Sequence, residues 1–327
     1  MKKLLCAMLA CMLPILFCAC ATTAKNTDDR WPVTVGNVTF THVPKQVVTL
    51  SPAMTDTLYA LGYGGRIVGV SNYCETPDEA QDTVACGTAL MPDTDTILQL
   101  KPDLLFCSAV LPTKATKSLE AAGVQIVVVT RAETTEGILE NYRLICTAFE
   151  GSKMGDLKTE QLALFVHTTL DYVNSAVAPA LPKKENKAIY LRQLPFVMAT
   201  GDTLEGELLT DMGFVNQGET YTGWSYPLEA EPDLNPNYIF CDTSVSLQAL
   251  QGSNYYQKTS AVTYEHIFTF DARIFERQSP RMFFELEDLM KKAFPDAFTM
   301  PKPSFVMSMP EPEPETEKTW WQKLLKK

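Results

Sequence analysis

The sequence has few histidines and none of the common catalytic motifs. It has only three histidines, His42, His167 and His266, which belong to different regions and share no motif. It contains no G-x-S-x-G elbow, no H-E-x-x-H pair and no Walker phosphate loop. Because catalysis needs a positioned base, nucleophile or metal, these absences favour a binding protein and argue against a metal site built from histidines.

Cysteine pairs of the zinc and redox types are also missing. Five cysteines follow Cys20, and none of them forms a C-x-x-C pair. Three lie in apolar runs and are expected to be buried thiols: Cys107, Cys146 and Cys241. Cys74 and Cys86 flank one short connection, and the sequence is compatible with either a disulfide or two reduced thiols there.

Positive charge is scarce. The chain has 28 Lys and Arg against 39 Asp and Glu, a net charge of −11, and loss of Lys2 and Lys3 with a leader would make it −13. Phosphate backbones are bound through a basic face, so we expect no nucleic-acid partner.

Long apolar runs are confined to the start of the chain. Lys2 and Lys3 precede an apolar run over residues 4–17, which is short for a membrane span and is followed by polar residues from 22. This pattern is typical of a secretory signal peptide, which we place at residues 1–19. No later stretch is suited to span a bilayer, so we expect the body of the protein to lie outside the cytoplasm.

The end of this leader resembles the lipobox of bacterial lipoproteins, because Cys20 directly follows Ala19. The resemblance implies cleavage before Cys20 and a lipid on its thiol that anchors the protein to the cell membrane. Phe17 stands where a lipobox usually has Leu. Ordinary secretion with Cys20 left free is the alternative.

One short pattern occurs twice in the chain. Residues 101–107 (KPDLLFC) and 235–241 (NPNYIFC) each have Pro second, followed by an apolar run that ends in Phe-Cys. Asp95 and Glu229 precede these two prolines by the same number of residues. Each apolar run predicts a buried parallel strand, and the repetition indicates two lobes of similar build. Coincidence between two ordinary Pro-led strands is the alternative.

Short apolar strands alternate with helical patterns on both sides of one long helical stretch. The alternation predicts an α/β fold of two lobes, each a small, mostly parallel sheet with flanking helices. Apolar residues recur at helical spacing from Met154 to Val177, which predicts a helix of about 40 Å, long enough to join the lobes. One long helix packed on a single body is the alternative. The predicted division is a leader over 1–19, a tether and hairpin over 20–43, an N-terminal lobe over 44–150, a linking helix over 151–178, a C-terminal lobe over 183–294, and an acidic Pro/Glu tail with a basic, aromatic end over 295–327.

Two lobes held apart by a helix would leave a cleft for a ligand. Open α/β sheets bind ligands at the carboxyl ends of their strands, and the loops there are rich in hydroxyls and aromatics. The candidate ligand contacts are Ser51, the aromatic residues Tyr73, Trp224 and Phe275, and, for ligand carboxylates or phosphate, Arg277 and Arg281. Core packing for Trp224 and ion pairs within the lobe for the arginines are the alternatives.

Several of these segments resemble the helical-backbone solute-binding proteins of ABC importers, which capture iron–siderophores, haem and cobalamin. The matching segments are residues 50–56 with Leu61-Gly62, residues 68–70 and residues 100–104, and residues 275–281 (FERQSPR) are similar to the cobalamin-binding branch. The resemblance covers roughly residues 44–294. It implies two α/β lobes joined by one rigid helix.

The resemblance also implies roles for particular residues. An acidic residue from each lobe docks on arginines of the permease in this family, and the matching positions are Asp95, one methylene shorter than the usual Glu, and Glu229. Both carboxylates could also be favoured by the positive end of a helix dipole, and this role is compatible with docking. Tyr73 and Trp224 match aromatic wall positions of the cobalamin branch.

The sequence does not decide which chelate is the ligand. Ala89 and Ser108 stand where the other two wall tryptophans of the cobalamin branch would be. The pocket could therefore suit a different corrinoid, a siderophore, or haem with Tyr73 as its axial ligand.

We therefore expect a lipid-anchored, monomeric solute-binding protein without a resident cofactor or metal. It would capture a metal chelate, either cobalamin or another corrinoid or a ferric siderophore, and deliver it to an ABC permease. The alternatives are an extracellular enzyme acting on such a ligand and an adhesion or scaffold protein that acts through the acidic tail.

Overall fold

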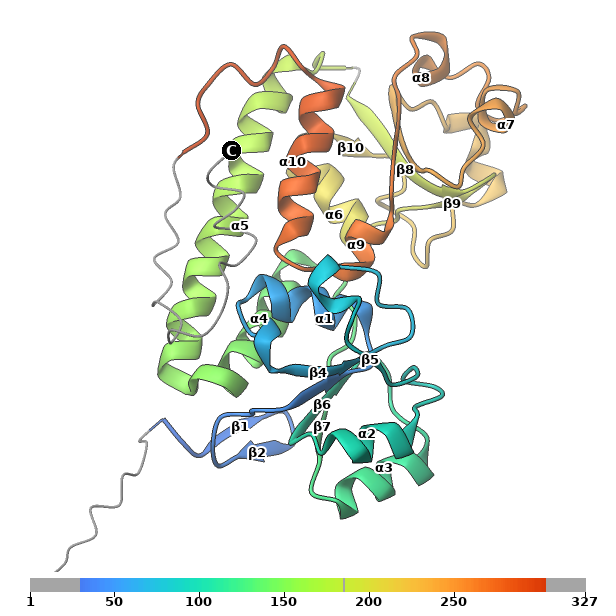
Figure 1. The fold of residues 1–327 in the computed structure, drawn as a ribbon. Helices are drawn as coiled ribbons and strands as arrows, with labels where there is room; N and C mark the ends of the chain where they lie inside the picture. Colours follow the sequence, from blue (N-terminus) through green and yellow to red (C-terminus); the bar gives the residue numbers. More distant parts are fainter. Residues whose placement is uncertain (1–29, 185, 304–327) are drawn as a thin grey trace, which may run out of the picture.

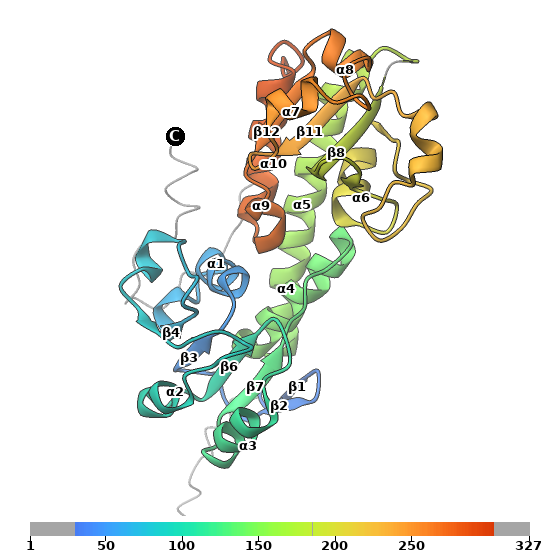
Figure 2. The same ribbon diagram turned by 90° about the vertical axis from the view of Figure 1, so that its right-hand side faces the viewer.

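The computed structural model describes residues 30–184 and 186–303, which form two α/β lobes joined by one long helix, α5 (Ser152–Ala180). Figure 1 shows α5 running along one side of both lobes, with the N-terminal lobe below and the C-terminal lobe above. In the view turned by 90°, the two sheets lie toward opposite ends of α5 (Figure 2). The predicted fold class is confirmed.

The sheet of the N-terminal lobe has five parallel strands in the order β5-β4-β3-β6-β7. These strands are β3 (Val47–Thr49), β4 (Ile67–Val70), β5 (Val84–Ala85), β6 (Leu104–Cys107) and β7 (Gln125–Val128). Val47 of β3 pairs with Leu104 of β6 and with Ile67 of β4, which places β3 in the middle of the sheet. Every residue of β6 is buried, as a continuous apolar run in a parallel sheet requires.

Helices cover both faces of this sheet. They are α1 (Pro52–Ala60), α2 (Thr94–Leu100), α3 (Thr113–Ala121) and α4 (Thr135–Glu150), with short 3-10 turns η1 (Gly64–Arg66) and η2 (Asp78–Ala80). Alternate strand residues face opposite layers, because Val47 and Leu104 belong to the core cluster with α1 and α4, whereas Val48 and Leu105 belong to the cluster with α2 and α3. α1 begins at Pro52, and the Ser51 hydroxyl caps it by accepting a hydrogen bond from the amide of Met54.

The sheet of the C-terminal lobe has the parallel order β10-β8-β11-β12, and β9 pairs antiparallel with β8. The strands are β8 (Lys187–Gln193), β9 (Val197–Met198), β10 (Val215–Asn216), β11 (Tyr238–Asp242) and β12 (Ile267–Phe270). The helices are α6 (Leu204–Asp211), α7 (Leu247–Gln251), α8 (Ser260–Thr263), α9 (Arg273–Arg277) and α10 (Arg281–Ala293), with a 3-10 turn η3 (Leu228–Asp233).

The two copies of the Pro-led pattern become interior strands. β6 lies between β3 and β7, and β11 lies between β8 and β12. Each is flanked by parallel neighbours on both sides, which explains the uninterrupted apolar run in both copies. The repeated Pro-led pattern therefore corresponds to strands at equivalent positions in the two sheets.

A hairpin of β1 (Val33–Val35) and β2 (Val38–Phe40) precedes the first lobe, as predicted. Its turn places Gly36 at φ +60°, a conformation that glycine adopts without steric cost. The buried side chains of Val33, Val35 and Phe40 join the core cluster that α4 and α5 share, so the hairpin is packed onto the body.

Helix α5 holds the lobes together through a continuous core. At 1.5 Å per residue its 29 residues span about 43 Å. Its buried side chains, such as Leu162 and Val173, belong to one cluster that contains Leu104 of the N-terminal lobe and Phe283 of the C-terminal lobe. α5 approaches α4 so closely that a Cβ on Gly155 would lie 2.7 Å from the Cα of Thr147. A shared core of this kind makes the helix a rigid connection.

The first residues of the predicted tail pack onto the C-terminal lobe. The Tyr172 hydroxyl of α5 donates a hydrogen bond to the Met300 carbonyl at 3.1 Å, and the Lys302 ammonium pairs with Glu287 of α10. Glu287 is buried and also pairs with Lys291 at 2.6 Å, so its charge is compensated from two sides.

Two further features bear on the sequence analysis. Cys74 and Cys86 are both free thiols, so the structure contains no disulfide at that connection. None of the helices in residues 30–184 and 186–303 combines the length and the apolar character needed to cross a bilayer. Cys20 and residues 304–327 lie outside the described residues.

Candidate functional site

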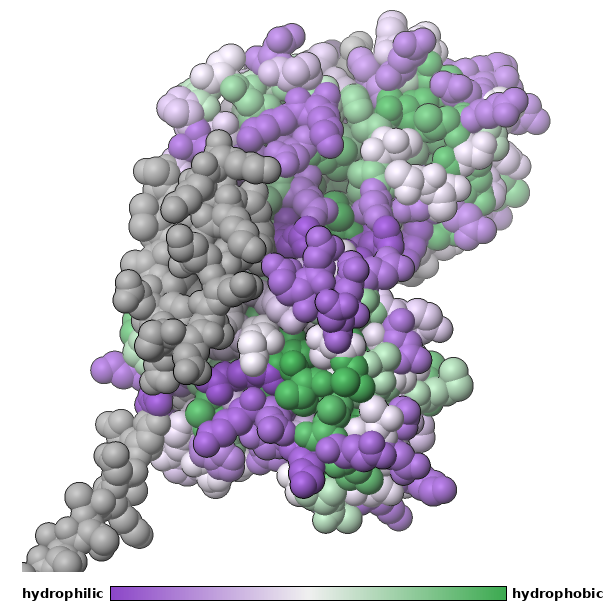
Figure 3. All heavy atoms as spheres, in the orientation of Figure 1, coloured by the Kyte–Doolittle hydropathy of each residue, from purple (hydrophilic) through white to green (hydrophobic). Residues whose placement is uncertain are grey.

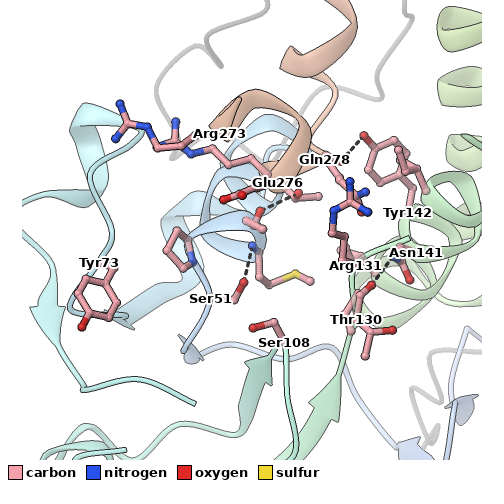
Figure 4. Close-up of a pocket in the computed structure, with 18 of the residues that line it drawn as sticks. Ser51, Tyr73, Ser108, Thr130, Arg131, Asn141, Tyr142, Arg273, Glu276 and Gln278 are labelled. Carbon is pink, nitrogen blue, oxygen red and sulfur yellow. Dashed lines mark hydrogen bonds between the residues drawn. The ribbon is translucent and has the colours of Figure 1, made fainter. Parts of the chain in front are cut away.

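A cavity of about 610 Å³ lies between the two lobes, within the range usual for small-molecule sites. Both lobes and helix α4 contribute to its walls. The lining residues are Ser51, Pro52, Ala53, Met54, Thr57, Tyr73, Glu75, Ser108, Val129, Thr130, Arg131, Ile138, Asn141, Tyr142, Ile145, Arg192, Arg273, Glu276, Arg277 and Gln278. Figure 4 shows side chains from both lobes converging on this space.

The carboxyl ends of three parallel strands supply the N-terminal wall. Ser51 follows β3, Ser108 follows β6, and Thr130 and Arg131 follow β7. This is the edge at which open α/β sheets present their loops to ligands. The cavity therefore lies where the sequence analysis expected a ligand.

One face of α4 forms a second wall. Ile138, Asn141, Tyr142 and Ile145 are spaced by three or four residues, which places them on the same side of the helix. The Asn141 side-chain amide donates to the Thr130 carbonyl at 3.0 Å, and the fully buried Tyr142 hydroxyl donates to the Gln278 carbonyl at 2.7 Å. These two bonds tie α4 to the strand ends and to the other lobe (Figure 4).

Arginine is the commonest charged residue in the lining of the cavity. Four arginines line it, Arg131, Arg192, Arg273 and Arg277, against two carboxylates, Glu75 and Glu276. Cations gathered in a cleft with low-dielectric walls attract anionic ligands. How much of this charge is left for a ligand depends on the carboxylate partners of each arginine.

Three of the four arginines have carboxylate partners. Arg192 pairs with Glu276, and its guanidinium carbon lies 5.3 Å from the ring centroid of Trp224. Arg273 pairs with Glu75 and Asp271 at 2.5 and 2.6 Å. The Arg277 guanidinium forms no hydrogen bond or ion pair within 4 Å to any other described residue, so it is the one best placed to bind a ligand anion.

Arg131 spans the two lobes through a buried partner. Its Nη2 donates to both carboxylate oxygens of Glu205 in α6, each at 2.9 Å. Burial raises the pKa of Glu205, whose side chain is 4% exposed, and the charge of Arg131 opposes that shift. Next to this pair, the Glu207 carboxylate accepts a hydrogen bond from the Thr135 amide at 2.8 Å.

The corner between α9 and α10 forms the floor of the cavity. Gln278 exchanges hydrogen bonds with the main chain of Ala132, at 2.8 Å to its amide and 2.7 Å to its carbonyl. The buried Asp56 of α1 accepts a hydrogen bond from the Ser279 hydroxyl and pairs with Arg281 at 3.3 Å. These buried contacts fix the orientation of one lobe against the other.

Three of the predicted ligand contacts line the cavity and three do not. Ser51, Tyr73 and Arg277 are lining residues, and the Tyr73 side chain is 70% exposed at the edge of the cavity (Figure 4). Phe275 is buried against Tyr190 and Phe270 inside the C-terminal lobe. Arg281 is engaged by Asp56, as described above.

Trp224 lies behind Arg192 and is half-buried. It has φ +61°, a left-handed conformation that is uncommon for a bulky residue. The Thr200 hydroxyl accepts a hydrogen bond from its amide at 3.2 Å, and its carbonyl accepts one from Met198 at 3.2 Å. Its ring also contacts Tyr190 edge-on, so the residue supports the wall that Arg192 presents to the cavity.

Four charged residues of the lining are not among the predicted contacts: Arg131, Arg192, Arg273 and Glu276. Arg131 follows a strongly apolar strand, and the rule that ligands bind at strand ends could have identified it. Arg273 precedes Arg277 by one helical turn, so the spacing was also available as a signal. Arg192 lies within β8, where nothing in the local pattern distinguishes it.

The two predicted docking carboxylates are exposed, one on each lobe. Asp95 lies in the first turn of α2, and Glu229 lies in the first turn of η3. Neither forms an ion pair with another residue of the described part of the chain. Both are therefore accessible to a partner.

No cluster of three or more His, Cys, Asp or Glu side chains suited to hold a metal ion occurs within residues 30–184 and 186–303. The lining residues include neither His nor Cys.

Sequence comparison relates the chain to transport proteins. A family model described as "Periplasmic binding protein" matches residues 47–274. The "Uncharacterized ABC transporter substrate-binding lipoprotein YvrC" of Bacillus subtilis is 27% identical, over 84% of this chain and 90% of that protein. A "Vitamin B12-binding protein" of Vibrio campbellii is 25% identical, over 57% and 66% of the two chains. The "Fe(3+)-citrate-binding protein YfmC" of B. subtilis is 25% identical, over 63% and 65%.

Structural comparison supports the same fold. A crystal structure of a "possible" iron-binding (periplasmic solute-binding) protein from Staphylococcus epidermidis superimposes with a TM-score of 0.65. The match covers 77% of this chain and 99% of that chain at 22% identity. At this identity the likeness concerns the fold.

Proposed function

This chain belongs to the periplasmic binding protein family, and we propose that it captures a metal chelate in the cavity between its lobes and delivers it to the permease of an ABC importer. Members of the family are solute-binding proteins, so the chain is a solute-binding protein and not an enzyme. The proposal concerns the class of ligand and the route of delivery.

The observation that carries the ligand class is one arginine of the cavity, Arg277. The other three lining arginines are paired with carboxylates, whereas the Arg277 guanidinium has no acidic partner within 4 Å in the described chain. Arginine binds carboxylates in a bidentate manner and stays charged at any physiological pH. A ferric siderophore or other ferric chelate with carboxylate groups matches this lining, in keeping with the relative named as Fe(3+)-citrate-binding.

A corrinoid is the second candidate. The likeness of residues 275–281 to the cobalamin branch and the relative named as vitamin B12-binding support it. The aromatic wall supports it less, because Tyr73 lines the cavity whereas Trp224 lies behind Arg192 and Ser108 contributes only a hydroxyl. We therefore favour the ferric chelate.

The proposal includes where the protein works. We propose cleavage before Cys20, a lipid on its thiol and a monomeric body outside the cytoplasm, in line with the relative named as a lipoprotein. The N-terminal lobe would comprise residues 44–150, the linking helix 151–178 and the C-terminal lobe 183–294. Asp95 and Glu229 would meet the permease, one from each lobe, and so set the orientation of docking.

The experiment is a binding panel on the purified mature chain. Isothermal titration would compare ferric citrate, haem and cyanocobalamin, with iron-free citrate as the control, and mass spectrometry would identify small molecules that co-purify. We expect ferric citrate or a co-purified ferric chelate to bind more tightly than the neutral cyanocobalamin. Absence of binding to every chelate, with no chelate co-purifying, would contradict the proposal.

A further inference from the structure

One arginine of the cavity is shared between the two lobes. The Nε and Nη2 atoms of Arg273 donate to Asp271 of the same lobe, at distances between 2.6 and 3.0 Å. The remaining edge, at Nη1, donates to the Glu75 carboxylate of the other lobe at 2.5 Å. Arg273 and Glu75 both line the cavity, so this ion pair crosses from one lobe to the other at the cavity wall.

We propose that Glu75 competes with the acidic groups of the ligand for the Nη1 edge of Arg273, and so sets how strongly the protein prefers charged chelates to neutral ones. This inference rests on the proposed function and names a specificity-determining residue for it. Glu75 would act as a carboxylate built into the chain, which a ligand carboxylate must displace.

Because Glu75 and Arg273 are both exposed to solvent, a ligand carboxylate can replace Glu75 at Arg273. The side chains of Arg273 and Glu75 are 56% and 66% exposed, and an ion pair in that setting is weak because water screens both charges. The Glu75 carboxylate has no second hydrogen-bond partner in the described part of the chain. Figure 3 shows hydrophilic residues gathered where α9 meets the N-terminal lobe.

The other ion pairs of the cavity either have a buried carboxylate or lie within one lobe. Glu205, the partner of Arg131, is buried and receives two hydrogen bonds, so its release would leave a charge uncompensated inside the protein. Glu276, the partner of Arg192, belongs to the same lobe as that arginine. Among the described residues that line the cavity, Glu75 therefore stands out as an exposed carboxylate that reaches across from the opposite lobe.

Asp271 keeps the arginine in place during the exchange. It holds the Nε–Nη2 edge, and its charge with that of Glu75 raises the pKa of Arg273, so the guanidinium stays charged and oriented. Arg277 follows one helical turn later and lines the same cavity. A chelate with two acidic groups could therefore contact both arginines once Glu75 has turned away.

The floor of the cavity indicates that the exchange needs only side-chain rotation. Gln278 and Ala132 are joined by two hydrogen bonds, and Asp56 binds Ser279, all in buried positions. Because these contacts hold the lobes in register, Glu75 can leave Arg273 without any movement of one lobe against the other.

The test is Glu75→Gln in the full mature chain, with ferric citrate as the charged probe and cyanocobalamin as the neutral one. We expect Glu75→Gln to tighten ferric citrate binding about two- to fivefold, the range that an exposed ion pair represents, with cyanocobalamin unchanged. Glu79→Gln, an exposed change of the same charge nearby, is the matched control and should leave the ratio of the two affinities unaltered. Thermal unfolding would verify that each variant is folded.

A double-mutant cycle makes the test specific to Arg273. In an Arg273→Gln background, Glu75→Gln should no longer tighten ferric citrate binding, because the contested site has been removed. Equal effects of Glu75→Gln on both probes, or tightening that persists without Arg273, would overturn the inference alone. Wild-type protein that binds neither probe nor any co-purified chelate would overturn the proposed function and this inference with it.

Discussion

Gln278 joins the two lobes through a pair of hydrogen bonds with Ala132. Its side-chain oxygen accepts from the Ala132 amide at 2.8 Å, and its side-chain nitrogen donates to the Ala132 carbonyl at 2.7 Å. Gln278 itself has φ +49° and is buried, and its own carbonyl accepts from Tyr142. One residue thus satisfies main-chain groups of the N-terminal lobe while its backbone turns the chain from α9 into α10.

Shortening this side chain should destabilise the protein. In Gln278→Asn the amide falls one methylene short of Ala132, while Asn tolerates the left-handed backbone. The buried Ala132 amide would lose its partner, and the carbonyl would keep only the 3.4 Å hydrogen bond from Nη1 of Arg131. This should lower the free energy of unfolding by about 2 kcal/mol. Urea denaturation followed by circular dichroism measures the loss. Gln257→Asn, at an exposed position, is the control, and an equal effect there would show that the Ala132 contact is not the cause.

Asp202 should govern part of the acid stability of the C-terminal lobe. The Thr200 hydroxyl and the Gly223 amide donate to its carboxylate, and these hydrogen bonds hold its pKa below the usual 3.8. A carboxylate with a lowered folded-state pKa stabilises the fold above the unfolded pKa, and this contribution disappears as the pH falls through the folded value.

We therefore expect Asp202→Asn to be less stable than wild type at about pH 5, with the difference shrinking below about pH 3.8. Denaturation midpoints measured across this range provide the readout. Asp82→Asn removes an exposed carboxylate elsewhere and should show no such convergence. A constant difference between wild type and Asp202→Asn at every pH would contradict the assignment.

Local patterns in the sequence were sufficient to predict the architecture of two α/β lobes. The two Pro-led apolar runs predicted β6 and β11, because a strand buried between parallel neighbours needs an uninterrupted apolar run. Helix α5 extends to Ala180 through Pro179, beyond the predicted end at 178, since its packing against both lobes outweighs the local cost of the proline.

Local sequence patterns could not predict which residues line the cavity. Phe275 and Arg277 are two residues apart on a helix and so point to different sides, and once Arg273 and Arg277 face the cavity Phe275 must face the core. Which of these sides faces the ligand depends on how the lobes meet, and that is decided by Gln278 and Asp56 far along the chain from their partners. The same tertiary arrangement places Arg192 in front of Trp224.

Arg277 should contribute to affinity without contributing to stability. Its guanidinium lines the cavity and makes no ion pair within the described chain, so Arg277→Ala leaves no carboxylate behind. A charged hydrogen bond is worth about 1.5–3 kcal/mol, which corresponds to a roughly ten- to hundredfold loss of affinity for a ferric chelate with carboxylates. Isothermal titration measures the loss.

The control for this variant is Arg143→Ala, which removes an exposed arginine of α4 that does not line the cavity. It should leave affinity unchanged. The thermal unfolding of Arg277→Ala should stay close to that of wild type. Loss of stability together with affinity would mean that Arg277 supports the fold rather than the ligand.

Asp95 and Glu229 should affect transport but not binding. The two carboxylates are exposed on separate lobes and lie away from the cavity lining, so the double variant Asp95→Ala/Glu229→Ala should keep wild-type affinity for the chelate. Loss of both charges should slow uptake in cells or proteoliposomes that carry the permease, since charges at a docking surface act mainly on encounter and register. Because screening weakens such contacts, the difference from wild type should shrink as ionic strength rises.

The charge-matched control is Glu120→Ala/Glu160→Ala, at exposed positions on α3 and α5. Uptake by the Asp95/Glu229 variant at the rate of that control would remove both residues from the docking surface.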